Sequence, residues 1–284
     1  MDKTVQIVGV PEHFNLPWHL ALEEGAFTSR GIDLTWTDVP EGTGKMAGML
    51  SSEEADMAVI LTEGLVKTVS EGTPAVIVQE YIASPLLWGV HVAHSSSYKQ
   101  EADLKGKTAA ISRYGSGSHL MAFVHARQNG WPLEDVGFEV VHTLEGAVEA
   151  LSADSADYFM WEKFTTQPLV DKEAFRRIGV CPTPWPCFLI ASTKAFAQKH
   201  PGVIQDILEI INVYTREFKQ IPSIDRTLAN RYGQALDAIR EWMSLTRWSQ
   251  QQIDAQKLKS VINTLNDLKL LSNDLKAEEL LWKP

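Results

Sequence analysis

The chain has 284 residues, of which 44% are hydrophobic and 22% are charged, a balance typical of a folded globular protein and not of a disordered one. Its formal net charge is −10, and an acidic surface repels phosphate backbones, so we expect no nucleic-acid partner. No run of about 18 apolar residues is present, so we expect no direct membrane insertion.

The first residues, Met1-Asp2-Lys3, lead directly into an apolar segment without a signal peptide. We therefore expect a cytoplasmic protein as the sequence stands, or a periplasmic or extracellular one if a signal peptide has been removed. The two cysteines, Cys181 and Cys187, have neither the spacing of a redox pair nor that of a zinc site. We interpret them as buried thiols.

Short apolar strands alternate with amphipathic helices in the first part of the chain. We expect strands at 4–10, 32–37, 57–61 and 74–79, and helices at 16–28, 44–51 and 62–70. The pattern then restarts, with strands expected at 107–111, 138–141 and 157–161 and helices at 118–129 and 144–152. This alternation predicts mostly parallel sheets with helices on both faces.

The two halves share a short sequence pattern. Leu50-Ser51 followed by Ala55-Asp56 matches Leu151-Ser152 followed by Ala156-Asp157 at a constant offset of 101 residues. In both places a helix ends and Ala-Asp precedes an apolar strand. The match indicates two similar α/β units, although chance similarity between two helix-to-strand turns would look the same.

From residue 196 onward the sequence becomes helical. Helices are expected at 200–220, 224–236 and 249–270, the last with Ser249 and Gln252 as a capping box. We expect these extra helices to pack on the first lobe. Lobe one then comprises residues 1–90 and 190–284, lobe two comprises 95–185, and the hinge crossings are 91–101 and 177–189. Two crossings predict hinge closure around a ligand in the inter-lobe cleft.

Several segments resemble type II solute-binding proteins of ABC importers. They are Ala21 to Phe27 with Gly31 to Leu34, Leu50 to Ala58, and Asp103 to Lys107. The sequence is most similar to the branch that binds sulfonates, nitrate and thiamine-pyrimidine precursors, which also contains the pyrimidine synthase of thiamine biosynthesis. The resemblance implies a two-lobed type II periplasmic-binding-protein-like fold. It also implies a small-molecule ligand and an ABC permease as the candidate protein partner.

Candidate ligand-binding residues lie in the loops that follow the strands, because parallel α/β sheets bind ligands beyond the carboxyl ends of their strands. In lobe one they are Glu12, Asn15, Trp18, Thr43 and Glu63, and in lobe two they are Arg113, Ser116, Ser118, Trp161 and Glu162. The loop from Arg113 to Ser118 combines glycines, hydroxyls and a helix start, which suits an anion. A plain capping loop is the alternative. The two tryptophans could stack on a planar ligand and the glutamates could accept hydrogen bonds from amino groups.

Three functions compete. The first is binding of a small polar solute, which can be aromatic or anionic, as the substrate-binding component of an ABC-type uptake system. The second is a cytoplasmic enzyme of thiamine-pyrimidine metabolism, for which Lys45 or Lys163 would have to hold pyridoxal phosphate. The third is a cytoplasmic sensor. The synthase's cysteine-rich cluster is absent, so we expect no enzymatic activity and no cofactor. The eight histidines lack metal-site spacing, so we expect no metal.

Overall fold

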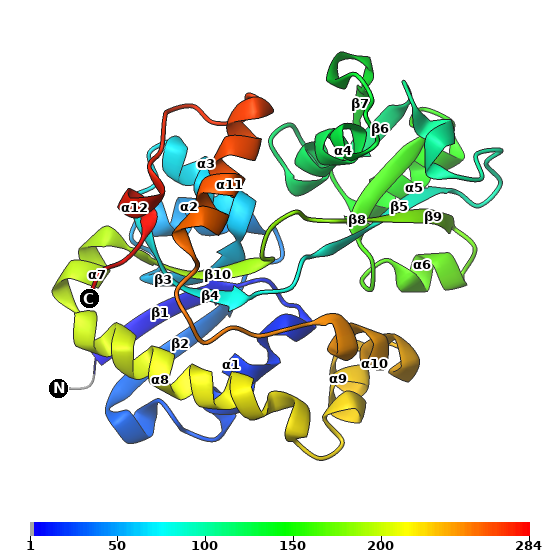
Figure 1. Ribbon diagram of the computed structural model, residues 1–284. Helices are drawn as coiled ribbons and strands as arrows, with labels where there is room; N and C mark the ends of the chain where they lie inside the picture. Colours follow the sequence, from blue (N-terminus) through cyan, green and yellow to red (C-terminus); the bar gives the residue numbers. More distant parts are fainter. Residues whose placement is uncertain (1–2) are drawn as a thin grey trace. The chain divides into compact units, whose positions relative to one another are not determined.

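The chain forms two compact units in the computed structural model, which describes residues 3–284. Unit 1 contains the chain up to Pro85 together with Trp185–Pro284, and unit 2 is Leu86–Pro184. Each unit has its own five-stranded sheet with helices packed on it (Figure 1). The expected fold class, a two-lobed α/β fold with mostly parallel sheets and extra C-terminal helices, is confirmed.

The chain passes between the units at positions that differ from the predicted hinge crossings. The first passage is at Pro85–Leu86 and not within 91–101, because residues 87–93 form a strand of the sheet in unit 2. The second passage, at Pro184–Trp185, lies within 177–189. That segment is not a simple linker, since parts of two strands occupy most of it.

The sheet of unit 1 has the strand order β2-β1-β3-β10-β4. Its strands are β1 (Lys3–Gly9), β2 (Ile32–Asp38), β3 (Met57–Leu61), β4 (Ala75–Ile82) and β10 (Phe188–Thr193). β1 pairs in parallel with β2 and β3, whereas β10 runs antiparallel to β3 and β4. The carboxyl ends of β1, β2 and β3 therefore share one edge of the sheet.

Helices cover both faces of this sheet. They are α1 (Leu16–Glu23), α2 (Thr43–Ser51), α3 (Thr62–Ser70), α7 (Lys194–Lys199), α8 (Pro201–Glu217), α9 (Ile224–Tyr232), α10 (Leu236–Leu245), α11 (Ala255–Asp267) and α12 (Ala277–Leu280). α1 and α8 lie together on one face, and α2, α3 and α11 lie on the other (Figure 1). Among residues 3–284, no helix combines the length and apolar character needed to cross a membrane.

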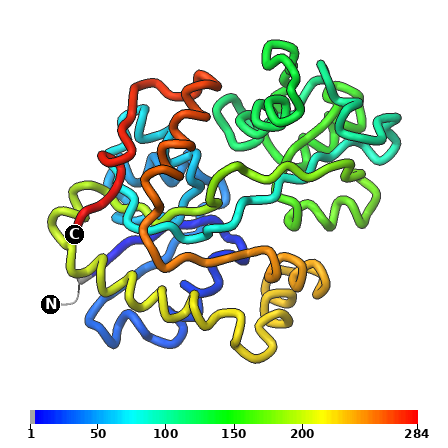
Figure 2. The backbone as a smooth tube through the Cα atoms, viewed as in Figure 1, coloured from blue at the N-terminus to red at the C-terminus, as the bar shows by residue number. Residues whose placement is uncertain are grey.

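The C-terminal segment of the chain returns along β4 in two places. Trp248 forms an antiparallel bridge with Ile82, and Leu281 forms a parallel bridge with Ile77. These are the orange and red parts of the tube in Figure 2. The expected capping box at Ser249 and Gln252 is wrong, because this stretch is extended and Asp254 caps α11 instead, its side chain accepting from the amides of two following residues. β4 is thus covered along its outer edge, which otherwise would expose unpaired backbone groups.

Unit 2 repeats the arrangement on a smaller scale. Its strand order is β7-β6-β8-β5-β9, from β5 (Leu87–Ala93), β6 (Thr108–Ile111), β7 (Gly137–Val140), β8 (Tyr158–Glu162) and β9 (Phe175–Pro182). Its helices are α4 (Gly117–Gln128), α5 (Leu144–Ser152) and α6 (Gln167–Asp171). A hydrophobic core that combines alanines with larger side chains joins α5 to the sheet and includes Ala110, Ala147 and Phe159.

The sequence pattern shared by the halves has one structural basis. In unit 1, Asp56 accepts a hydrogen bond from the Gln6 amide at 2.8 Å and its own amide donates to the Gln6 carbonyl. In unit 2, Asp157 makes the same pair of bonds with Thr108. Glu53 and Asp154, three residues before these aspartates, both have positive φ. Each aspartate thus fixes the turn that starts the third parallel strand of its unit.

Candidate functional site

The carboxyl edge of β1, β2 and β3 brings together four residues predicted from the sequence. Glu12 and Asn15 follow β1, Thr43 begins α2 after β2, and Glu63 lies in the first turn of α3 after β3. The starts of α2 and α3 are in close contact, since a Cβ atom on Gly64 would lie 2.2 Å from the Thr43 side chain. Glycine at position 64 therefore permits this approach.

Glu63 is a buried carboxyl group with one oxygen engaged. The Trp185 indole donates to its Oε2 at 2.7 Å, while Oε1 is buried without a hydrogen-bond partner among the described residues. Burial raises the pKa of Glu63 to about 7, because an ionised carboxylate loses its hydration there. At neutral pH this group can accept a hydrogen bond or, when protonated, donate one.

Asn15 presents a second acceptor at the same edge. Its side-chain amide nitrogen donates to the Val10 carbonyl at 2.8 Å, which fixes the side chain in the loop after β1. Its Oδ1 atom is fully buried and has no partner within the described structure. Unpaired buried acceptors are costly unless a ligand or water satisfies them. Glu12 beside it is only partly buried.

Trp18 is a core residue of unit 1, which corrects the expectation that it stacks on a ligand. Its side chain is fully buried. The rings of Phe27, Trp36 and Tyr81 surround it at centroid distances of 6.1, 5.7 and 6.3 Å. Because α1 turns this residue toward the sheet, its indole has no surface left for a ligand.

In unit 2 the loop after β6 and the start of α4 form a set of linked hydroxyl groups. Ser116 caps α4 and accepts from the His119 amide at 3.3 Å. The Ser118 hydroxyl lies 3.0 Å from the Ser116 hydroxyl and accepts from the Ser112 amide at 3.0 Å. Ser116 therefore has the capping role that the sequence left as the alternative, whereas Ser118, expected in that alternative to be the cap, is the second residue of α4 and ties the helix to the loop after β6. These contacts also hold the first amides of a twelve-residue helix at the carboxyl edge, where an anion is favoured.

Arg113 and Tyr114 are exposed side chains of the same loop. Arg113 forms no ion pair with the described residues and is available to an anion. Tyr114 is 65% exposed, which is unusual for an aromatic ring in this protein, and its ring lies edge-on to His119. We did not select Tyr114 from the sequence, although its place between Arg113 and Gly115 was a usable signal.

Trp161 and Glu162 end β8 and have different roles. Trp161 is partly exposed and stacks on Phe159 with a centroid distance of 5.5 Å. Glu162 is buried and accepts from the Thr165 amide at 2.6 Å, and burial raises its pKa. Glu162 therefore caps the turn after β8, while Trp161 retains an open ring surface.

Trp88 is a site residue that sequence reasoning missed. Its ring supports the start of α4, since a Cβ atom on Gly117 would lie 2.8 Å from it, and it meets Trp161 edge-on at 6.3 Å. Its Nε1 atom is buried with no acceptor in residues 3–284. The residue lies in β5, the end of which falls within the hinge crossing that the sequence predicts at 91–101. The apolar run from Leu87 to Ala93 was the signal that identifies this strand.

The two edges offer opposite chemistry. Unit 1 presents the oxygen acceptors of Asn15 and Glu63, whereas unit 2 presents a helix start and the Arg113 guanidinium. No group of three or more His, Cys, Asp or Glu side chains within residues 3–284 is placed to hold a metal ion. Each edge, taken by itself, suits hydrogen bonding to a small polar group.

Comparison with known proteins gives one family match, which covers part of the chain. A family model described as Ca3427-like PBP, for periplasmic binding protein, matches residues 88–181, almost all of unit 2. No curated protein sequence is significantly similar to this chain.

Solved structures match over nearly the whole length. The Candida albicans CA3427 gene product, described as having the generic periplasmic binding protein fold, is 24% identical with a TM-score of 0.87, over 96% of this chain and 92% of that one. The Escherichia coli aliphatic sulphonate binding protein SsuA is 17% identical with a TM-score of 0.79, over 99% and 98%. The alkanesulfonate-binding SsuA of Xanthomonas axonopodis pv. citri, bound to MOPS, is 16% identical with a TM-score of 0.82, over 99% and 98%.

These similarities establish the fold of the chain as that of periplasmic binding proteins. The narrower expectation, membership in the branch that binds sulfonates, nitrate and thiamine-pyrimidine precursors, stays a prediction.

Proposed function

We propose that this protein is the substrate-binding component of an ABC-type uptake system and that an ABC permease is its protein partner. Its solute is a small organic anion that also carries a hydrogen-bond donor, such as an amino group. The loops at the carboxyl edges of both units hold this solute, and the units close on it by a hinge motion.

The opposite hydrogen-bonding character of the two edges is the observation that carries the proposal. A sulfonate or carboxylate matches the start of α4 and Arg113 in unit 2. An amino group matches the buried, unpartnered oxygens of Asn15 and Glu63 in unit 1. This chain shares its fold with two sulfonate-binding proteins, which supports a sulfonate as the anionic group of the solute.

Native mass spectrometry of the purified protein, followed by calorimetry with 2-aminoethanesulfonate and related aminoalkyl sulfonates and carboxylates, tests the proposal. We expect a retained small molecule or saturable one-to-one binding. Simple alkanesulfonates that lack the amino group should bind more weakly, because they leave the acceptors of unit 1 unpaired. Absence of both a retained molecule and any saturable binding across this panel would contradict the proposal.

A further inference from the structure

Unit 1 contains a hollow next to the end of β4. Its volume is about 470 Å³, within the range of about 300–1,000 Å³ typical of small-molecule sites and far larger than a bare sulfate or phosphate ion needs. Its walls come from the extended segment 247–251, from Arg216 near the end of α8 and from Ala83 after β4. None of the predicted site residues lines it.

Unpaired positive charge gathers at this hollow. Arg216 and Arg247 are exposed, and neither guanidinium forms an ion pair or hydrogen bond with the described residues. Two other exposed arginines of unit 1 are paired, since Arg30 bonds to Asp206 and Glu209, and Arg240 bonds to Asp225. Partial burial, and then the nearby charge of Arg247, lower the pKa of Lys219, which shows that a further cation is close. This clustering occurs in a chain whose formal charge is −10.

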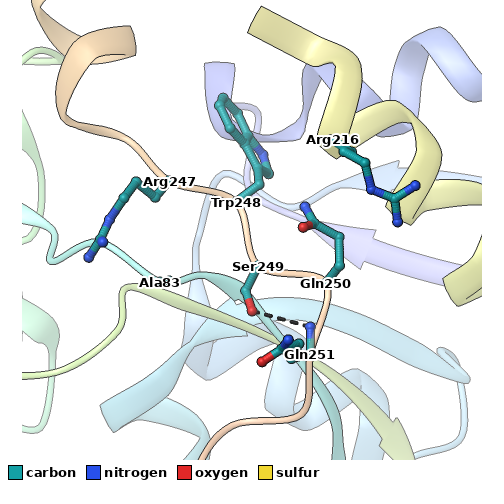
Figure 3. Close-up of a pocket in the computed structure, with 7 residues that line it drawn as sticks. All are labelled: Ala83, Arg216, Arg247, Trp248, Ser249, Gln250 and Gln251. Carbon is teal, nitrogen blue, oxygen red and sulfur yellow. Dashed lines mark hydrogen bonds between the residues drawn. The ribbon is translucent and has the colours of Figure 1, made fainter.

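The cations flank an aromatic wall. In Figure 3, Arg247 and Arg216 lie on opposite sides of the close-up, with the Trp248 ring and the Gln250 side chain between them. The Trp248 ring is partly exposed, packs on Phe218 at a centroid distance of 4.8 Å, and points its Nε1 atom toward the Phe14 carbonyl at 3.4 Å. A partly exposed aromatic ring is therefore combined with an arginine on each side.

Backbone hydrogen bonds hold the segment that carries these side chains. The Ser249 amide donates to the Tyr81 carbonyl at 2.9 Å, and the Ala83 amide donates to the Arg247 carbonyl at 2.8 Å. Within the segment, the Gln251 amide donates to the Ser249 hydroxyl at 3.2 Å (Figure 3). Because the segment is tied to β4, the walls of the hollow are ordered before any ligand arrives, which lowers the entropic cost of binding.

We propose that this hollow is a second ligand site, which binds a small organic oxyanion bearing a flat ring. The ring stacks on Trp248, and the oxyanion pairs with the guanidinium of Arg216 or Arg247. The site does not depend on the proposed solute-binding function, since none of the residues proposed to hold that solute lines the hollow.

Calorimetric titration with naphthalene-2-sulfonate tests the proposal. The test compares the wild-type protein with the double variant R216Q/R247Q. We expect the double variant to bind at least tenfold more weakly, a loss of about 1.4 kcal/mol or more, because a charge-assisted hydrogen bond is removed. The neutral isostere naphthalene-2-sulfonamide should bind the wild type at least tenfold more weakly than the sulfonate does.

Two control variants distinguish binding at this hollow from a general charge effect and from binding at the edge of unit 2. R30Q/R240Q makes the same change in net charge at other exposed arginines and should alter affinity less than twofold. Arg113→Ala changes the candidate edge of unit 2. This variant should still bind naphthalene-2-sulfonate at the hollow, and that binding should be the part that R216Q/R247Q weakens. The proposal is overturned if R216Q/R247Q binds like the wild type, if R30Q/R240Q weakens binding equally, or if Arg113→Ala alone abolishes all binding. Circular dichroism of each variant checks that the fold is retained.

Discussion

The two units repeat one topology but present different chemistry at equivalent edges. The aspartates 56 and 157 fix the same turn, and both sheets place loops after three parallel strands at one edge. At that edge unit 1 buries acceptor oxygens, whereas unit 2 exposes donors and a positive charge. A scaffold that occurs twice in one chain can therefore keep its framework hydrogen bonds while only the residues after its strands differ. Loops can change in this way because the sheet supports them.

Acid should weaken both units through a buried histidine in each. Burial lowers the pKa of His13 in unit 1 to about 3, and burial together with Arg177 lowers that of His91 in unit 2 to about 3. An unfolded histidine titrates near 6.5, so the unfolded chain binds more protons between these values. The stability present above pH 6.5 is therefore lost as pH falls toward 3, by on the order of 4 kcal/mol for each group.

Urea unfolding at several pH values between about 4 and 7 measures this loss. His13→Phe should remove the contribution of one histidine from the pH dependence of the unfolding free energy. Phenylalanine preserves the ring contact with Trp242, so the fold should be retained. His142→Asn should leave it unchanged, because His142 is exposed and asparagine tolerates its positive φ. Equal pH dependence in the wild type and His13→Phe would contradict this account of unit 1.

The two predicted stacking tryptophans should differ in their effect on stability. Trp18→Ala should cost about 3–5 kcal/mol of unfolding free energy, because it empties a fully buried site in unit 1. Trp161→Ala should cost only about 1–2 kcal/mol, since part of its ring is already exposed in unit 2. Denaturant unfolding of the two variants measures both values. Similar costs at the two positions would mean that Trp161 is also a core residue.

Glu63 should make the protein less stable at higher pH. Its folded pKa is about 7 and its ordinary value is 4.5, so the folded state binds more protons between these values. Stability therefore falls as pH rises through this window, by about 3 kcal/mol in total. Glu63→Gln keeps an acceptor for the Trp185 indole and removes this pH-dependent loss of stability. Thermal unfolding should show that the stability of Glu63→Gln relative to the wild type increases between about pH 5 and pH 8. Glu139→Gln, at an exposed position, should show no such increase.

Strands and helices with strong local patterns were predictable from the sequence. The strand 57–61 and the helices 62–70 and 144–152 have the predicted bounds. The strands β5 and β9 were missed as complete elements. β9 contains Arg176, Arg177 and Gly179, and its extended form depends on pairing with β5, which no local pattern reveals. Likewise α11 begins after segment 247–251, because that segment pairs with β4.

The sequence was sufficient to predict which loops form the candidate site, but not which way their side chains point. The rule that ligands meet the carboxyl ends of parallel strands selected the loops that contain Asn15 and Glu63. It could not show that the Trp18 ring turns into the core, since a residue in the first turn of a helix can face either way. The partner of Glu63, Trp185, comes from 122 residues away, a contact that only the fold creates.

Calorimetry of 2-aminoethanesulfonate, or of the retained solute if one is found, with single variants of each edge tests whether both units hold one solute. Arg113→Ala in unit 2 and Glu63→Gln in unit 1 should each weaken binding, the former by about 1.5–3 kcal/mol as a charge-assisted hydrogen bond is lost. Arg240→Ala, at an exposed ion pair on α10, should leave affinity unchanged. Weakening by both edge variants is the result we predict. Binding that depends on one edge alone, with the other variant equal to the wild type, would contradict the claim that both units hold one solute.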